Sequence, residues 1–192
     1  MIRETESALS KFIARKLHFL FPLPLKYQGA AVVFQEVPDE ISLAINICGC
    51  ERNCPGCHSP HLQKYIGNYL RSNIDALIAE NSAVSCVCFM GGDQNLRELR
   101  KIVRRIRRKY PRLKIALYTG EDDAEKLIRI GEMIKPDYLK FGPYIENRGP
   151  LDKPGSNQRF LKITYPYGYK VPLEYTMMTD LTYVFQMRKL KL

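Results

Sequence analysis

Residues 84–93 read VSCVCFMGGD, residues 114–120 read KIALYTG, and residues 137–143 read DYLKFGP. Each stretch starts with the apolar residues typical of a strand, which we expect at 84–90, 114–118 and 137–141, and ends in a glycine turn. Between them, residues 95–109 and 122–134 carry apolar side chains at helical spacing. Strands that alternate with helices of this length indicate βαβ units and a parallel sheet, so we predict an α/β fold.

The rest of the chain carries weaker signals. Residues 30–37 and 41–47 are predicted strands, and residues 73–80 a short helix with Asn73 as its N-cap. Residues 4–21 have helical spacing that two prolines end, at Pro22 and Pro24. Two further strands are predicted at 159–163 and 181–188.

The special residues of the sequence fall directly after predicted strands. A cysteine-rich loop, residues 48–60, follows one strand, and the other three are followed by Gly91-Gly92-Asp93, Thr119-Gly120 and Gly142-Pro143. Active sites of parallel α/β sheets lie where the strands end. We therefore expect these four loops to meet at one edge of the sheet, provided that the strands are parallel neighbours.

The composition is that of a globular protein. The 192 residues include 30 Lys and Arg against 20 Asp and Glu, a formal net charge of +10, and 45% are apolar. This excludes intrinsic disorder and fibrous proteins, and no apolar run approaches the roughly 18 residues of a membrane span. Residues 1–7, MIRETES, do not resemble a secretory signal, so we predict a cytoplasmic protein with reduced cysteines. The positive net charge predicts acidic partners.

Three of the six cysteines form the pattern C-x3-C-x2-C at Cys50, Cys54 and Cys57. Three thiolates on one short loop can bind three irons of a cuboidal iron–sulfur cluster and leave the fourth iron open for a substrate. Pro55 and Gly56 permit the sharp turn that this requires.

Other interpretations of the motif remain open. Residues 54–58, CPGCH, also match a c-type haem attachment site, which occurs in exported proteins. A zinc site could use the three cysteines with His58 or His61, and Cys54 with Cys57 could form a thioredoxin-like redox pair. We assign the remaining cysteines to packing: Cys48, Cys86 and Cys88.

With these motifs, the chain resembles the radical S-adenosylmethionine (SAM) enzymes and, more narrowly, the family that activates anaerobic (class III) ribonucleoside-triphosphate reductases. The resemblance covers about residues 26–163. It is carried by residues 41–60 (ISLAINICGCERNCPGCHSP), 89–93 (FMGGD), 141–146 (FGPYIE) and 155–160 (GSNQRF). The chain departs from that family at Gln94, where many members have proline.

The length and the pattern of elements predict a single domain over residues 1–192, and the resemblance implies that it is folded as a partial, open (βα) barrel with a mostly parallel sheet. Residues 1–25 would be an N-terminal helical extension, 26–163 the core and 164–192 an irregular tail. It also implies a [4Fe–4S] cluster on the three motif cysteines, with SAM on the open iron. Gly56, Cys57 and His58 would lie against SAM, Gly91, Gly92 and Asp93 would receive its ammonium group, and Thr119 would be a further SAM contact.

The implied reaction is reductive cleavage of SAM to methionine and a 5′-deoxyadenosyl radical, which removes a hydrogen atom from a glycine of the partner reductase. The implied partners are the anaerobic ribonucleoside-triphosphate reductase and a flavodoxin- or ferredoxin-type electron donor. We expect no membrane association. A radical SAM enzyme acting on a small molecule, or on another glycyl-radical enzyme such as pyruvate formate-lyase, remains an alternative.

A strongly basic segment indicates a second possible class of function, that of a binding module. Between residues 96 and 109, Glu98 is the only acidic residue among eight basic ones: Arg97, Arg100, Lys101, Arg104, Arg105, Arg107, Arg108 and Lys109. Such a helix can be a solvated face, a docking surface for an acidic protein or, with less support, a nucleic-acid contact. A non-catalytic, metal-stabilised binding module would need only this segment and the cysteines, whereas a SAM site also needs Gly91-Gly92-Asp93.

Overall fold

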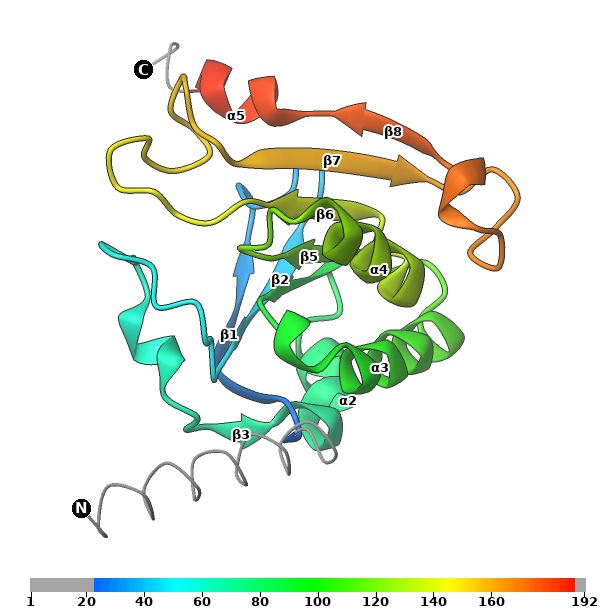
Figure 1. The fold of residues 1–192 in the computed structure, drawn as a ribbon. Helices are drawn as coiled ribbons and strands as arrows, with labels where there is room; N and C mark the ends of the chain where they lie inside the picture. Colours follow the sequence, from blue (N-terminus) through cyan, green and yellow to red (C-terminus); the bar gives the residue numbers. More distant parts are fainter. Residues whose placement is uncertain (1–22, 189–192) are drawn as a thin grey trace, which may run out of the picture.

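The computed structural model describes residues 23–188, so the helix expected at 4–21 lies outside the described residues. One sheet of eight strands, in the order β3-β1-β2-β4-β5-β6-β7-β8, runs through the molecule (Figure 1). The strands are β1 (Lys26–Val33), β2 (Ser42–Ile47), β3 (Asn68–Tyr69), β4 (Cys86–Met90), β5 (Lys114–Tyr118), β6 (Tyr138–Phe141), β7 (Arg159–Thr164) and β8 (Met177–Asp180).

The sheet is mixed and open. The central pairs β2–β4, β4–β5 and β5–β6 are parallel, whereas β1–β2, β1–β3, β6–β7 and β7–β8 are antiparallel. The expectation of a mostly parallel sheet is therefore correct only for the four central strands. The outer strands return directly beside their neighbours without a crossover helix, which antiparallel pairing permits. The sheet ends at β3 and β8 and does not close into a barrel.

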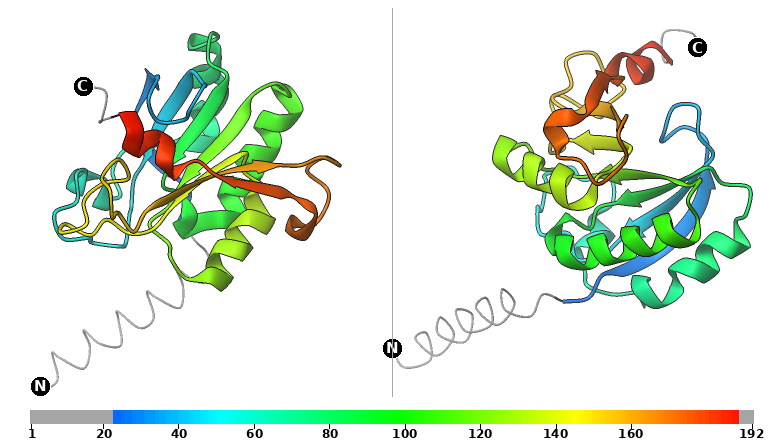
Figure 2. Two further views of the ribbon diagram at one scale, coloured as in Figure 1. Left: turned by 90° about the horizontal axis from the view of Figure 1, so that it is seen from above. Right: turned by 90° about the vertical axis from the view of Figure 1, so that its right-hand side faces the viewer.

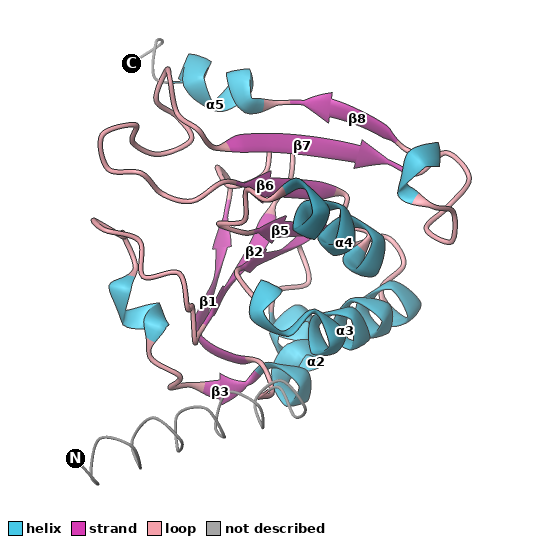
Figure 3. Ribbon diagram, in the orientation of Figure 1, coloured by secondary structure: helices cyan, strands magenta, loops and turns pink. Residues whose placement is uncertain are grey.

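Three helices, α2 (Leu70–Glu80), α3 (Leu96–Lys109) and α4 (Ala124–Ile134), pack on one face of the sheet (Figure 3). The fourth, α5 (Thr182–Arg188), packs on the opposite face, close to β7 and β8 (Figure 2). Single 3-10 turns occur at Pro60–Gln63, Asp93–Asn95 and Leu173–Tyr175. None of the described helices has the length and apolar character needed to cross a bilayer.

Strand β4 shows how the central strands build both faces of the core. Val87 and Phe89 pack under the three helices, whereas Cys86 and Cys88 point to the other face, where Phe160 also packs. All are fully buried, as expected for a parallel strand covered on both sides. Burial raises the pKa of both thiols, so these two cysteines are neutral packing residues, as predicted.

Helix α2 begins earlier than predicted. It starts at Leu70, which is fully buried, because β3 pairs with β1 and delivers the chain directly into the helix. Asn73 is therefore not the N-cap: it lies within the first turn, and its Nδ2 donates to the carbonyl of Tyr69 at 2.8 Å. The predicted strand at 30–37 is likewise shifted, since pairing with β2 ends where Val33 meets Ser42.

The strand predicted at 181–188 is wrong, and the tail is less irregular than expected. These residues form α5, preceded by the unpredicted strand β8. The pairing of β7 with β8 ends here because the backbone N–H of Phe160 donates to the hydroxyl of Thr182 at 3.0 Å. Phe185 then packs on Phe160, with ring centroids 4.8 Å apart, while Tyr183 faces solvent.

Candidate iron–sulfur site

The four loops that follow β2, β4, β5 and β6 lie at one edge of the sheet, as predicted from the order of strands and helices. Backbone hydrogen bonds join the start of each loop to the neighbouring strand, and one joins two loops, from Gly142 to Glu121 at 2.8 Å. Gly91 donates to Tyr118 at 3.0 Å, and Thr119 donates to Lys140 at 2.8 Å. The prediction holds because the four strands are parallel neighbours.

The cysteine motif lies on the loop that leaves β2. Cys50 is exposed, and Cys54 and Cys57 are half-buried. The amide of Cys50 donates to the carbonyl of Leu62 at 3.1 Å, and the amide of Cys57 donates to Cys54 at 3.2 Å. Gly56, at a φ of +68°, makes the tight turn between the last two cysteines.

Cys54 and Cys57 are close enough to Cys50 to affect its ionisation. Burial raises the pKa of Cys50, and the charges of Asp93, Cys54 and Cys57 raise it further, since neighbouring anions disfavour a new thiolate. Bound iron would relieve this repulsion, because metal binding favours the deprotonated thiol. A donor set of three thiols on one loop therefore fits an iron–sulfur cluster.

The three sulfurs do not converge as the ligands of one ion would. Within residues 23–188, no group of three or more His, Cys, Asp and Glu side chains is arranged so that it could hold a single metal ion. In a [4Fe–4S] cluster each thiolate binds a different iron, so the sulfurs need not meet at one centre. The fit to a cluster rests on the donor set and on its accessible loop.

Asp93 and Thr119, predicted as neighbours in the site, are in direct contact. Oδ2 of Asp93 accepts from the hydroxyl of Thr119 at 2.7 Å and from Nη2 of Arg52 at 3.0 Å. The same Arg52 nitrogen donates to Oε2 of Glu121 at 3.0 Å. Sequence reasoning missed Arg52 and Glu121: both lie on the predicted site loops, but nothing in the sequence shows that they pair.

Glu121 is held as a carboxylate. Burial alone would raise its pKa, but hydrogen bonds from Arg52 and from the amides of Asp123 and Asp122 lower it to about 2. Arg52, at 3.0 Å, and Lys126, at 3.7 Å, are the positive charges next to its Oε2. Arg52 forms ion pairs with both Glu121 and Asp93 and so bridges the two strand ends.

The glycines of the Gly91-Gly92-Asp93 segment turn the chain from β4 into α3. Both have positive φ angles, +100° and +107°, which L side chains rarely adopt. Gln94, which departs from the resembled family, stabilises this turn: its Oε1 accepts from Gly92 at 3.1 Å, and its Nε2 donates to the carbonyl of Cys48 at 2.8 Å. Gln94 thus links this turn to the start of the cysteine loop.

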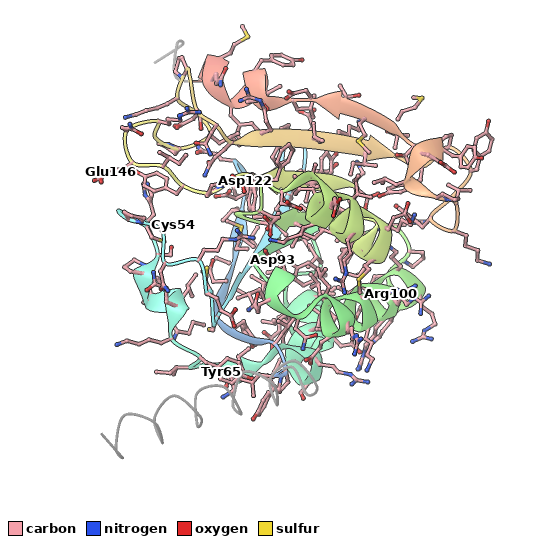
Figure 4. All side chains as sticks on the ribbon, in the orientation of Figure 1. Cys54, Tyr65, Asp93, Arg100, Asp122 and Glu146 are labelled. Carbon is pink, nitrogen blue, oxygen red and sulfur yellow. The ribbon has the colours of Figure 1, made fainter. Side chains whose placement is uncertain are left out.

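The loop after β6 faces the cysteine loop from the other side. The ring of His58 lies edge-on to Tyr144, with centroids 4.9 Å apart. A Cβ added to Gly56 would come within 3.2 Å of the carboxyl carbon of Glu146. Figure 4 shows Cys54 and Glu146 on these facing loops. Neither Tyr144 nor Glu146 was predicted as a site residue, although both fall in the FGPYIE segment.

The SNQR segment, one of the stretches that carry the resemblance, supports that loop. Nδ2 of Asn157 donates to the carbonyl of Pro143 at 2.9 Å. Lys140, at the end of β6, adds a cation near the cysteines. Burial lowers its pKa to about 8, although the charges of Cys54 and Glu36 oppose this shift.

Comparison with known proteins agrees with this assignment. No curated protein and no solved structure matches the chain. Residues 41–135 match the family model described as a 4Fe-4S single cluster domain, and they include the cysteine loop, Gly91-Gly92-Asp93 and Thr119. Residues 41–135 are therefore similar to a 4Fe-4S single cluster domain, which supports an iron–sulfur site on the cysteine loop.

Proposed function

We propose that this chain is a radical SAM activating enzyme that generates a glycyl radical on an anaerobic ribonucleoside-triphosphate reductase. The observation that carries the proposal is the meeting of the cysteine loop with Asp93 and Thr119 at one edge of the sheet. A reduced [4Fe–4S] cluster at such a site supplies the electron that cleaves SAM to methionine and a 5′-deoxyadenosyl radical, the hydrogen-atom acceptor.

The predicted cluster ligands and the residues of the two glycine-containing loops have the following roles in this proposal. Cys50, Cys54 and Cys57 would hold the cluster, and Gly56 and His58 would lie against SAM. The carbonyls of the two glycines and the carboxylate of Asp93 would receive the SAM ammonium, which needs acceptors and a negative charge once it leaves water. Among residues 23–188, Oδ2 of Asp93 has two donors whereas Oδ1 has none, so this oxygen is open to a ligand.

A macromolecular substrate suits the open sheet. The sheet does not wrap around the edge that carries the site, so a partner surface would have to cover it and exclude water. A glycine-bearing loop of a large reductase would meet this need. The facing loops with His58 and Tyr144 would form the rim on which such a loop closes.

The basic side chains of α3 favour an acidic surface on a protein partner. Arg105 and Lys109 pair with Asp75, and Arg107 pairs with Asp137. The remaining five are exposed, have no partner among residues 23–188 and fall on one arc of the helix: Arg97, Arg100, Lys101, Arg104 and Arg108. We call these five residues the basic face; Arg100 marks its position in Figure 4.

Anaerobic reconstitution with iron and sulfide tests the proposal. With a strong reductant, the loaded protein should convert SAM to methionine and 5′-deoxyadenosine. Addition of the reductase should then produce a glycyl-radical doublet in the electron paramagnetic resonance (EPR) spectrum. A doublet with pyruvate formate-lyase and none with the reductase would reject the partner but keep the chemistry. An iron-loaded protein that leaves SAM intact would contradict the proposal.

A further inference from the structure

Arg52 connects the cysteine loop to the ends of two strands. It lies in the loop between the first two motif cysteines, and its Nη2 donates to Asp93 after β4 and to Glu121 after β5, both at 3.0 Å. Its side chain is 29% exposed, so both ion pairs are partly shielded from water. Charged hydrogen bonds in such surroundings are stronger than those on an open surface.

Both acceptors are themselves held in place. Glu121 accepts through Oε1 from the amides of Asp122 at 3.1 Å and Asp123 at 3.2 Å, which leaves Oε2 directed at Arg52. Asp93 accepts from the hydroxyl of Thr119. Arg52 thus joins the loop to two carboxylates whose positions are fixed by the strand ends.

Gly120 provides the space for this side chain. A Cβ at position 120 would lie 2.6 Å from Cδ and 3.0 Å from Nε of Arg52. No positive φ constrains Gly120, and a larger residue there would displace the Arg52 side chain from this position. The space left by Gly120 and the positions of the two carboxylate acceptors therefore favour the same placement of the Arg52 side chain.

We propose that Arg52 is a positioning residue that ties the cysteine loop to the strand ends and orients Asp93 with Oδ1 open to a cationic ligand group. The first part of the proposal, the tie between the cysteine loop and the strand ends, is supported by the contacts alone. The second part, the orientation of Asp93 toward a ligand (the ligand half), rests on the proposed function. Competition between Arg52 and the ligand for Asp93 is the opposite possibility. The geometry favours positioning, because Arg52 and Thr119 both contact Oδ2 and leave Oδ1 without a donor from the described residues.

Hydrogen exchange of the metal-free protein tests the tie. Arg52→Met should raise the exchange of the loop amides of Cys50 and Cys57 by about tenfold, the factor that ~1.4 kcal/mol of lost local stability gives. Strand β5 serves as the internal reference. Arg100→Met, which removes the same charge from an exposed residue without a described partner, should leave the loop unchanged. Unaltered loop exchange in Arg52→Met would overturn the proposal.

Glu121→Gln examines the same contact from the strand side with a nearly isosteric change, so it does not depend on how Arg52→Met folds. It should raise loop exchange less than Arg52→Met does. The double variant should exchange no faster than Arg52→Met alone, because Glu121 acts on the loop through Arg52. Additive effects in the double variant would contradict this coupling.

Equilibrium dialysis of SAM against the reconstituted protein tests the ligand half. Arg52→Met should weaken binding by about tenfold, and Arg52→Lys should restore part of it. Tighter binding by Arg52→Met would show competition and overturn positioning. Failure of the wild type to bind SAM would overturn both the proposed function and the ligand half, while hydrogen exchange would still decide the tie.

Discussion

Five of the six cysteines fall into two regions with opposite surroundings. Cys86 and Cys88 lie in β4 with no exposed surface, and burial raises the pKa of both thiols. The motif cysteines lie on an accessible loop at the sheet edge, and Lys140 and Arg52 are near them. The same residue type is therefore a small apolar side chain in the core and a candidate iron ligand at the edge.

The strongest test of this division is replacement of single cysteines. Cys50→Ala, Cys54→Ala or Cys57→Ala should abolish the oxygen-sensitive brown chromophore, because each thiolate would bind a different iron. Cys86→Ala and Cys88→Ala are the matched controls and should retain it. Absorbance together with iron and sulfide content measures the effect. Loss of the chromophore in the control variants alone would reverse the assignment.

The next effect separates the cluster from the ligand. Asp93→Ala should weaken SAM binding while the cluster remains, since loss of one charge-assisted contact costs roughly 1.5–3 kcal/mol, about tenfold or more in affinity. Equilibrium dialysis and iron content measure the two outcomes separately. Unchanged affinity would show that the ammonium group binds elsewhere.

A smaller effect is expected from the basic face, which is not part of the site. Reversal of charge at Arg100, Arg104 and Arg108 should lower activation of the reductase and make it more salt-sensitive, but leave SAM cleavage without a partner unchanged. Arg105→Glu is the control, because it reverses a charge on the same helix outside the basic face and disrupts the pair with Asp75. If the three reversals leave activation unaffected but abolish binding of nucleic acid by the protein, the basic face is a nucleic-acid contact instead.

The last effect concerns the buried pair and appears only at alkaline pH. In the unfolded chain the thiols ionise near pH 8.5, whereas the folded protein keeps Cys86 and Cys88 protonated, so the folded state binds more protons above that pH. The free energy of unfolding should be unaffected by these thiols below pH 8 and fall above it. The loss approaches about 1.4 kcal/mol per pH unit for each thiol. Urea unfolding of Cys86→Ala and Cys88→Ala should show a shallower decline, and an equal decline would contradict the burial argument.

The sequence predicted the central part of the fold because its signals are local. Strand β5 has the predicted bounds, and α3 has buried residues at the expected spacing, from Leu99 to Ile106. Strand β8 could not be predicted, since all four of its residues are exposed and carry no apolar alternation. Helix α5 was mistaken for a strand because the pairing of β7 with β8 ends at the hydrogen bond from the amide of Phe160 to the hydroxyl of Thr182. These two residues are distant in the sequence, so their contact leaves no local signal.

The candidate site also has a part that could be predicted from the sequence and a part that could not. The spacing of the cysteines and the position of Asp93 are visible in the sequence, and their meeting follows from the order of parallel strands. The bridge through Arg52 is not visible, because it depends on a side chain crossing from one loop to two others past Gly120. Contacts of this kind between distant loops have no periodic signal.

EPR spectroscopy of the reduced protein, with and without SAM, tests most directly whether the cysteine loop and the Asp93 edge form one site. Anaerobic reconstitution should give about four irons and four sulfides per chain, and the reduced protein should have a cluster signal that shifts when SAM is added. In Asp93→Ala the signal should remain, but more SAM should be needed to shift it. A protein that binds zinc without iron and sulfide, or a cluster signal that SAM leaves unchanged, would contradict the account.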